Sequence, residues 1–365
     1  MSDTVLAAVK VAPESTELRE FRMPEVPIDG ALMKVEAAGV CGSDPGAYRR
    51  AHSDCIMGHE NAGTIVGIGS IAAERWGLSE GDRVVVEEYL PCWHCAHCLA
   101  GDFRLCAAGR TDAPGALRYG HTGVDVAPSL WGGFAQYVYL PSNAVIHRLP
   151  ANVTAELASL AVPLSNGVEW ACIDGGAGPG RTVLINGAGQ QGQGCAIAAS
   201  YHGADLVIVA GRSNEAARLA MATRVGADAT INLDKEDLKE RVMELTGGVG
   251  VDVFVDTSDD DEATTTRAAL DVVSTDRQAT ILISGSATFE LPFNVVKRKY
   301  VTVRAYRGHS YHSIERALRY LSDDRFPIQR LCTHQFGLSD VDTAIKATGG
   351  VGVEGAIHVS VNPWL

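Results

Sequence analysis

The chain has 365 residues, a length that predicts two domains rather than a single hydrophobic core. The sequence is 46% hydrophobic and 21% charged, the balance of an ordinary globular protein, which excludes an intrinsically disordered one. A formal net charge of −13 argues against a nucleic acid or an anionic membrane surface as the partner. The sequence has no apolar run of about 18 residues and no secretory pattern at its start, so we expect a cytoplasmic protein.

Short β-like segments separated by glycine and proline dominate residues 1–164. Runs rich in Val, Leu and Ala predict strands over 4–11, 31–37, 63–68, 83–87 and 134–140. Pro24, Pro27 and Gly30 mark turns between the first two of these strands. This pattern predicts a compact, irregular β domain.

A cysteine, a histidine and a glutamate lie in the glycine-rich stretch 39–63. Cys41 opens the run Cys-Gly-Ser-Asp, and His59 and Glu60 belong to the run Gly-His-Glu-Asn-Ala-Gly. A thiolate, an imidazole and a carboxylate are ligand types of a zinc site that keeps one position open. Zinc in such a site polarises an alcohol or carbonyl oxygen. Taken alone, one cysteine and one histidine are more often packing residues, so this interpretation depends on the motifs that follow.

The strongest local signal is a group of four cysteines. Two residues separate Cys92 from Cys95 and Cys95 from Cys98, and seven residues separate Cys98 from Cys106. Four thiolates close a tetrahedral zinc shell with no open position, which predicts a structural zinc site. An iron–sulfur cluster is disfavoured, because the bacterial run has three residues before its last cysteine and a proline after it. The odd total of nine cysteines fits a reducing compartment better than a disulfide framework.

The pattern of predicted secondary structure changes near residue 181. The β-rich run 182–186 leads into Gly-Ala-Gly-Gln-Gln-Gly and then into an alanine-rich helical stretch that ends near His202. Between a strand and a helix, such glycines permit a tight turn and the close approach of a dinucleotide pyrophosphate to the helix N-terminus. A loop that only reverses the chain is the less favoured alternative. We therefore predict a dinucleotide-binding loop made of Gly187, Gly189, Gln190, Gln191 and Gly192.

Strand-like and helical segments alternate after this loop. Strands are predicted over 206–210, 229–233, 251–256, 280–284 and 300–304, with helices between them. Alternation of this kind predicts an α/β domain with a doubly wound parallel sheet, so we expect residues 165–306 to form a Rossmann domain.

The end of the second strand of this domain bears on the choice between NAD and NADP. An acidic residue about twenty positions after the glycine loop hydrogen-bonds the ribose 2′-OH of NAD. Here Gly211 takes that place and leaves room for a 2′-phosphate, to which Arg212 and Ser213 offer a charge and a hydrogen bond. We therefore favour NADP, and the alternative is that Arg212 is a solvated turn residue.

In this order, the motifs resemble those of the zinc-containing medium-chain dehydrogenases/reductases, the alcohol and polyol dehydrogenases, over essentially the whole chain. The resemblance implies a GroES-like β catalytic domain that is split between residues 1–164 and 307–365, around the Rossmann domain. A helix predicted over 313–321 and a strand predicted over 355–361 fit the return of the chain to the first domain. The resemblance also implies a homodimer or homotetramer.

The same resemblance implies roles for single residues. Cys41 and His59 correspond to ligands of a catalytic zinc, and Glu60 corresponds to a carboxylate that ligates the metal in some states. Ser43 corresponds to the hydroxyl that contacts the substrate oxygen and begins a proton relay. Asp44 corresponds to the carboxylate that orients the zinc-bound histidine, a role that also fits a residue capping its own turn.

Two positions depart from the family pattern. Polyol dehydrogenases have Glu-Pro-Leu where this chain has Val162-Pro-Leu, so Glu60 or water must fill the remaining metal position, or zinc is held weakly. A relay histidine often follows the serine by three residues, but that position is Gly46 here. Tyr48 and His52 are the nearby candidates for passing the proton to solvent.

Together, these observations predict an enzyme with two zinc ions per chain that transfers a hydride between NADP(H) and a small alcohol, ketone or aldehyde. NADP-dependent secondary alcohol dehydrogenases of the family carry Gly-Ser-Arg where this chain has residues 211–213, in agreement with this cofactor. The first alternative is an NAD-dependent polyol or sugar dehydrogenase, against which the loss of the glutamate at Val162 counts. The second is a catalytically silent protein that binds zinc and a nucleotide.

Overall fold

The computed structural model describes residues 3–51, 54–110, 113, 115–258, 264–284 and 290–365. His52, one of the two predicted relay residues, lies outside these ranges. The chain divides into two compact units. The first contains Met1–Val162, Ser310–Asp323 and Gln329–Leu365, and the second contains Pro163–His309 and Asp324–Ile328. The domain boundaries expected from the sequence, at 164/165 and 306/307, compare with unit boundaries at 162/163 and 309/310.

The first unit contains two β-sheets with short helices between the strands. Its strands are β1 (Thr4–Ala12), β2 (Ser15–Arg22), β3 (Ala31–Gly39), β4 (Cys55–Ile56), β5 (Glu60–Ile68), β6 (Arg83–Val86), β7 (Tyr137–Leu140), β8 (Ile146–Arg148), β15 (Cys332–Phe336) and β16 (His358–Val361). Its helices are α1 (Asp44–Arg49), α2 (Ser70–Trp76), α3 (Ala96–Leu99), α4 (Ala155–Ala158), α11 (Tyr311–Leu321) and α12 (Val341–Thr348).

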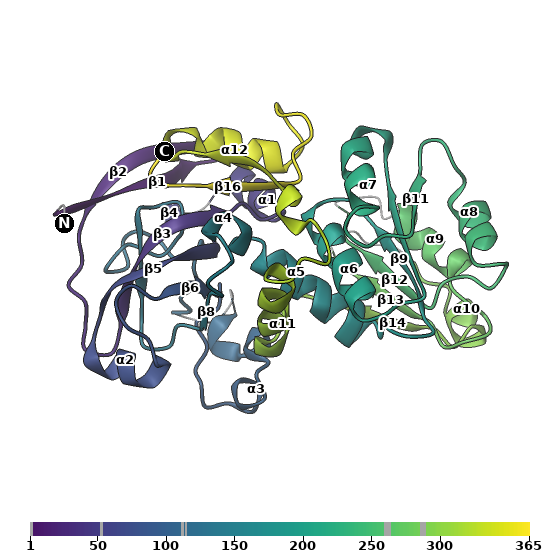
Figure 1. Cartoon of the computed structure of the whole chain (residues 1–365), viewed down its shortest axis with the longest axis horizontal. Helices are drawn as coiled ribbons and strands as arrows, with labels where there is room; N and C mark the ends of the chain where they lie inside the picture. Colours follow the sequence, from purple (N-terminus) through teal and green to yellow (C-terminus); the bar gives the residue numbers. More distant parts are fainter. Residues whose placement is uncertain (1–2, 52–53, 111–112, 114, 259–263, 285–289) are drawn as a thin grey trace. The chain divides into compact units, whose positions relative to one another are not determined.

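One sheet of this unit joins segments from both ends of the chain. It has seven strands in the order β15-β16-β3-β5-β6-β8, with β7 paired to β3, and the other sheet has the order β2-β1-β4. Helix α12 packs on β16 (Figure 1) and buries Val341, Ala344 and Ile345 in the core that the strands form. The expected return of the C-terminal segment to the first domain is therefore seen in the pairing of β16 with β3.

The antiparallel pairing of β3 with β5 brings the two metal-capable motifs together. Gly39, the last residue of β3, lies opposite Glu60, the first residue of β5. Cys41 follows the end of β3 by two residues, and His59 directly precedes β5. The register of one strand pair therefore places a cysteine and a histidine that are eighteen positions apart at the same end of the sheet.

The second unit contains a six-stranded parallel sheet in the order β11-β10-β9-β12-β13-β14. This strand order, with the first strand in the middle, is that of a dinucleotide-binding domain. The strands are β9 (Thr182–Asn186), β10 (Leu206–Gly211), β11 (Ala229–Asn232), β12 (Val253–Asp256), β13 (Thr280–Ile283) and β14 (Thr302–Ala305). The helices of this part of the chain are α5 (Ala161–Gly167), which begins at the unit boundary, α6 (Gln190–Tyr201), α7 (Ala216–Ala222), α8 (Leu238–Leu245), α9 (Thr264–Val272) and α10 (Phe293–Arg298).

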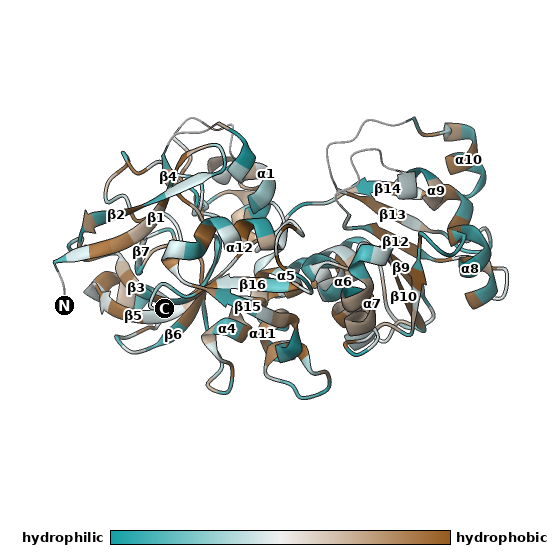
Figure 2. Ribbon diagram, turned by 90° about the horizontal axis from the view of Figure 1, so that it is seen from above, coloured by the Kyte–Doolittle hydropathy of each residue, from teal (hydrophilic) through white to brown (hydrophobic). Residues whose placement is uncertain are grey.

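Helices cover both faces of this sheet. Helices α6 and α7 lie on one face, and α8, α9 and α10 lie on the other (Figure 1). Because both faces are covered, the central strands are continuously apolar, and they are mostly brown in Figure 2. The predicted doubly wound parallel sheet is confirmed.

The predicted strands occur where expected, with shifted ends. The alternation at 63–68 belongs to a longer strand, β5, and the strand predicted at 355–361 is shorter, β16. Strand β2 was not predicted, because its sequence, STELREFR, is polar on both faces. Its pairing with β1, a tertiary feature, makes it a strand. None of the helices in the described ranges combines the length and apolarity that a bilayer crossing needs.

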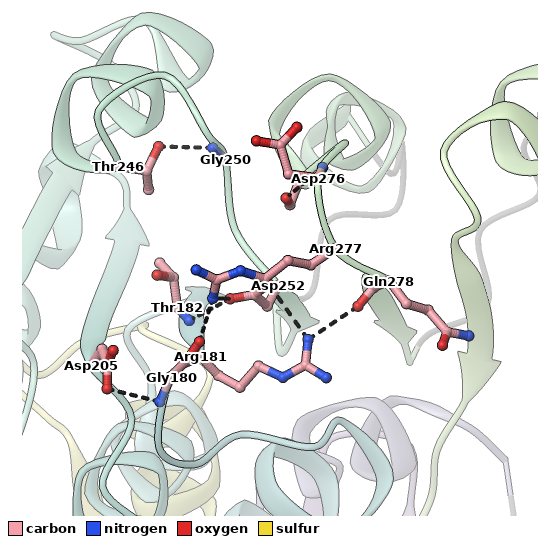
Figure 3. A network of polar contacts seen from close by, with 11 residues as sticks. Gly180, Arg181, Thr182, Asp205, Thr246, Gly250, Asp252, Asp276, Arg277 and Gln278 are labelled. Carbon is pink, nitrogen blue, oxygen red and sulfur yellow. Dashed lines mark hydrogen bonds and ion pairs between the residues drawn. The ribbon is translucent and has the colours of Figure 1, made fainter.

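A buried carboxylate joins the starts of three strands of the parallel sheet (Figure 3). Asp252 Oδ2 accepts a 2.9 Å hydrogen bond from the backbone N–H of Thr182, and its two oxygens lie 3.5 and 3.4 Å from Arg181 Nη1 and Arg277 Nη1. Arg181 also donates to the carbonyl oxygen of Gln278 at 3.2 Å. Asp252 therefore ties the beginnings of β9 and β12 to the segment before β13.

Replacing this carboxylate tests the network. We expect Asp252→Ala to lower the free energy of unfolding by about 1–3 kcal/mol, because it removes a buried acceptor from two arginines and a backbone donor. Urea denaturation measures this change. The control is Asp205→Ala, which removes an exposed carboxylate that accepts from Gly180 N–H at 2.9 Å and should cost within about 0.5 kcal/mol. Equal small losses for both variants would show that Asp252 does not hold the sheet edge together.

Candidate metal centres and nucleotide-binding loop

Cys41, His59 and Glu60 lie together in the first unit. One ligand atom of each lies within 4.8 Å of a ligand atom of the other two. His59 and Glu60 are buried, and Cys41 is half-buried. Gly39 makes this arrangement possible, because a Cβ at that position would lie 2.4 Å from Glu60 Oε2. The structure thus gathers a thiol, an imidazole and a carboxylate, the ligand types that zinc binds.

Some polar atoms of this cluster are buried and have no hydrogen-bond partner within the described ranges. Among the described residues, His59 Nδ1 and both carboxylate oxygens of Glu60 are buried and have no hydrogen-bond partner. Nearly all buried polar groups in proteins are hydrogen-bonded, so a group of three unpaired atoms requires an explanation. A metal ion bound by Glu60 would account for its two unpaired oxygens, and the donor set of the cluster fits zinc.

The pKa values of Cys41, His59 and Glu60 are all raised. Burial and the nearby Glu60 carboxylate raise the pKa of the Cys41 thiol, and burial raises the pKa of Glu60 to about 8. For His59, burial alone lowers the pKa, but the Glu88 and Asp44 carboxylates outweigh it and raise the pKa well above its usual value. Binding of a divalent cation would release protons from side chains whose pKa is raised in this way.

Asp44 is placed to orient the histidine. It is buried at the start of α1, where its Oδ2 accepts a 2.9 Å hydrogen bond from the backbone N–H of Cys41. Its Oδ1 lies 3.7 Å from His59 Nδ1. One carboxylate thus contacts the backbone of one candidate ligand and faces the ring of another, the arrangement expected of a carboxylate that orients a metal-bound histidine.

Ser43 and Tyr48, two other predicted catalytic residues, differ in their exposure to solvent. Ser43 is exposed at the N-terminus of α1, and its carbonyl oxygen accepts from Ala47 N–H at 3.0 Å. Tyr48 is buried in the core, where burial and the neighbouring Asp342 carboxylate of α12 raise the pKa of its hydroxyl. A hydroxyl that faces α12 is poorly placed to carry a proton to solvent.

Three residues near His59 were not predicted from the sequence. One ligand atom each from Glu88 and His121 lies within 4.8 Å of His59, and the His59 and His121 rings stack with centroids 5.9 Å apart. Arg118 Nη2 pairs with Glu88 Oε1 at 2.6 Å. No motif marks these residues, and the available signal was a charged pair, residues 87 and 88, directly after the apolar strand β6.

The four predicted cysteines form a second compact cluster around α3. Their sulfur atoms all lie within 4.8 Å of one another, and Cys98 Sγ is 3.9 Å from Cys92 Sγ and 3.4 Å from Cys95 Sγ. Cys106 Sγ accepts from the backbone N–H of Cys92 at 3.4 Å. The backbone N–H groups of residues 94 and 95 help to lower the pKa of Cys92 to about 6. All nine cysteines lie in described ranges and none forms a disulfide, so the four thiols fit a closed zinc shell.

In the second unit, the glycine loop connects β9 to α6. Gly187 adopts a φ of +100°, a conformation that favours glycine. A Cβ on Gly192 would lie 1.9 Å from the carbonyl oxygen of Gly187, so the turn and the first turn of α6 require glycine at both positions. Gly189 caps α6 and has open space beside it, next to the helix N-terminus where a phosphate binds. Gln190 is buried, and Gln191 Oε1 accepts from Asn166 Nδ2 at 3.2 Å.

The segment after β10 is more acidic than its sequence suggests. Arg212 Nη1 lies 3.7 Å from Asp234 Oδ1, and Ser213 N–H donates to Asp234 Oδ2 at 2.7 Å. Glu215 Oε2 accepts from Arg212 N–H at 3.0 Å and lies 2.9 Å from the place of a Cβ on Gly211. Two carboxylates therefore surround the glycine, arginine and serine that were predicted to bind a 2′-phosphate.

The two metal clusters predict a specific metal content. After dialysis against a weak chelator, we expect two zinc ions per wild-type chain by atomic emission spectroscopy. His59→Ala should retain one, and Cys106→Ser should retain fewer than two while also unfolding at a lower temperature, because a closed structural site contributes to folding. Cys195→Ser, which alters a buried cysteine outside both clusters, should leave the metal content unchanged. A wild-type content of one would contradict one of the two assignments, and the variants would identify which.

Comparisons with known proteins identify the family of the chain. A family model for an alcohol dehydrogenase GroES-like domain matches residues 28–151, and a model for a zinc-binding dehydrogenase matches residues 192–323. The chain is 34% identical to a probable alcohol dehydrogenase of Mycobacterium tuberculosis, over 93% of this chain and 95% of that protein. It is 28% identical to the erythritol/L-threitol dehydrogenase of Mycolicibacterium smegmatis, over 98% of this chain and 97% of that protein.

A solved structure agrees in fold over the whole length. An Escherichia coli oxidoreductase/dehydrogenase of unknown specificity matches with a TM-score of 0.84 and 26% identity, over 98% of this chain and 99% of that one. The order of motifs, the parallel sheet and these likenesses lead to one conclusion. The chain belongs to the zinc-containing medium-chain dehydrogenase/reductase family, the alcohol and polyol dehydrogenases, as its motifs predicted.

Proposed function

We propose that this protein is a reversible NADP(H)-dependent dehydrogenase of a small alcohol or ketone, with one catalytic and one structural zinc ion per chain. The observation that carries the proposal is the buried cluster of Cys41, His59 and Glu60, whose unpaired polar atoms fit a metal ion. Zinc in that place supplies a Lewis acid for an alcohol or carbonyl oxygen, and a nicotinamide dinucleotide supplies the hydride acceptor or donor.

Residues around the cluster orient the His59 ring and transfer the proton. Asp44 fixes the orientation of the His59 ring through its carboxylate. Ser43 presents an exposed hydroxyl two residues after Cys41, where it can contact a substrate oxygen and pass its proton onward. Tyr48 is buried away from solvent, and His52 stays a prediction outside the described residues.

The proposed proton step can be tested at Ser43. We expect Ser43→Ala to lower kcat for alcohol oxidation by about 100-fold or more, the scale of a lost acid–base group, while zinc content is unchanged. The control is Ser70→Ala, another exposed serine at a helix start, which should keep full activity. Full activity of Ser43→Ala would remove this residue from the proposal, and inactivity of the wild type with a panel of alcohols, ketones and aldehydes would favour the catalytically silent alternative.

The cofactor choice depends on two opposing groups. The Arg212 guanidinium and the Ser213 hydroxyl favour a 2′-phosphate, and Gly211 lacks the acidic side chain that would repel it. The Glu215 carboxylate beside Gly211 favours a ribose hydroxyl instead, which keeps NAD as the second candidate. We favour NADP, because an arginine is present where the 2′-phosphate would need one.

Two substitutions separate the cofactors. If NADP is used, Arg212→Ala should lower kcat/KM with NADP about tenfold or more while kcat/KM with NAD changes little, because only NADP carries the charge that Arg212 binds. Glu215→Gln should move the NADP/NAD ratio of kcat/KM in the opposite direction. A wild-type preference for NAD that Arg212→Ala leaves intact would overturn the NADP assignment.

The proposed chemistry is compatible with more than one class of substrate. The relatives named above include an alcohol dehydrogenase and a dehydrogenase of erythritol and threitol, so a polyol is the alternative to a simple alcohol. Val162, where polyol dehydrogenases carry a glutamate, favours the simple alcohol. We also propose, from the family, a cytoplasmic homodimer or homotetramer.

A further inference from the structure

The residues Glu88, Arg118 and His121 surround one side of His59 and have no part in the function proposed above. Glu88 follows β6, and the other two residues lie in the segment between the cysteine cluster and β7. Together with His59, Glu88 and His121 offer two imidazoles and one carboxylate, with one ligand atom of each within 4.8 Å of the others. Two histidines and a glutamate are the protein ligands of several catalytic zinc sites.

The Glu88 carboxylate has one oxygen engaged and one available. Arg118 Nη2 and His121 Nε2 both contact Oε1, at 2.6 and 3.2 Å. Among the described residues, no hydrogen bond reaches Oε2. A carboxylate that is fixed through one oxygen and unpaired at the other is arranged as a metal ligand that is oriented by its neighbours.

The loop that carries His121 is held in place by its own hydrogen bonds. Thr122 Oγ1 accepts from Arg118 N–H at 2.8 Å and donates to the Arg118 carbonyl oxygen at 2.9 Å. Gly120 N–H donates to the carbonyl oxygen of Trp131 at 2.7 Å. The ring of His121 is therefore presented to His59 by a fixed turn.

A cavity lies beside one member of this cluster, His121, within the first unit. His121 lines a cavity of about 310 Å³ together with Arg110, Arg118 and Thr122. A hydrated divalent ion or a small ligand fits a space of this size. His121 is about one-third exposed, whereas His59 is buried.

From these observations we infer that His59, Glu88 and His121 form a second set of ligands for a divalent cation, adjacent to Cys41 and Glu60 and sharing His59 with them. Because both sets need His59, they compete for a single ion. The second set contains nitrogen and oxygen ligands without a thiolate, so it accepts ions such as zinc, cobalt and manganese. The inference rests on the proposed metal role of His59, and it gives the ion an alternative position in a chain that lacks the glutamate at Val162.

The experiment separates the two sets by removing the thiolate. Chelated full-length protein is loaded with cadmium-113 and observed by NMR, where each thiolate ligand moves the cadmium signal strongly downfield. The wild type should give one signal for the four-cysteine cluster and one for a site with a single thiolate. Cys41→Ser should keep a second signal, shifted upfield into the range of nitrogen and oxygen ligands.

A further substitution in the Cys41→Ser background identifies the ligands. Adding Glu88→Gln should abolish the upfield signal or weaken cadmium binding there by at least tenfold. Adding Glu36→Gln should leave it unchanged, because Glu36 is another arginine-paired glutamate, 3.6 Å from Arg83, in the same sheet region. Adding Arg118→Gln should also keep the signal, since it removes the partner of Glu88 and leaves the carboxylate. Circular dichroism spectra check that each variant is folded.

Three results would overturn the inference. One is a Cys41→Ser spectrum with only the four-cysteine signal. The second is retention of the upfield signal in Cys41→Ser/Glu88→Gln. The third is loss of the signal in Cys41→Ser/Arg118→Gln as complete as in the Glu88→Gln variant, which would mean that Glu88 acts only as a structural partner of Arg118. Absence of the single-thiolate signal from the wild type would instead contradict the catalytic site under "Proposed function", so the two failures are distinguishable.

Discussion

The first unit depends on one electrostatic constraint: ionisable side chains lie side by side in its interior, and among the described residues His59 and Glu60 have buried polar atoms without a hydrogen-bond partner. Cys41, His59 and Glu60 are brought to one place by the pairing of β3 with β5, and Gly39 opens the space that the glutamate needs. Burying such groups is costly unless an opposite charge or a metal compensates. A divalent cation bound there would provide this compensation, and Asp44 would then orient the His59 ring. The local fold and the expected chemistry thus follow from the same requirement.

The sequence revealed this cluster because its members sit in short glycine-containing motifs. Cys41 follows the apolar strand predicted over 31–37, and His59 precedes the one predicted over 63–68. The cysteine cluster was equally easy to predict, since four closely spaced cysteines indicate a metal site. The parallel sheet followed from the alternation of strand and helix after residue 181. These are local signals, and local signals are what a single sequence preserves.

Glu88 and His121 could not be predicted in the same way. They reach His59 from segments that follow β6 and precede β7, and no spacing rule connects positions 59, 88 and 121. The surroundings of Arg212 were hidden for the same reason, because Asp234 comes from the segment after β11 and meets Arg212 only through the parallel pairing of β10 with β11. Tyr48 was placed with Ser43 because the two are close in sequence, and the structure shows that its side chain is buried. What the sequence missed is therefore tertiary in origin.

The central claim is that a metal ion occupies the buried cluster in the first unit. X-ray diffraction at the zinc absorption edge, from crystals of the full chain, tests it most directly. The account predicts two anomalous peaks per chain, one among the four cysteines and one within bonding distance of Cys41 Sγ or of the His59 ring. A single peak at the cysteines, with Cys41, His59 and Glu60 hydrogen-bonded only to protein or water, would contradict it.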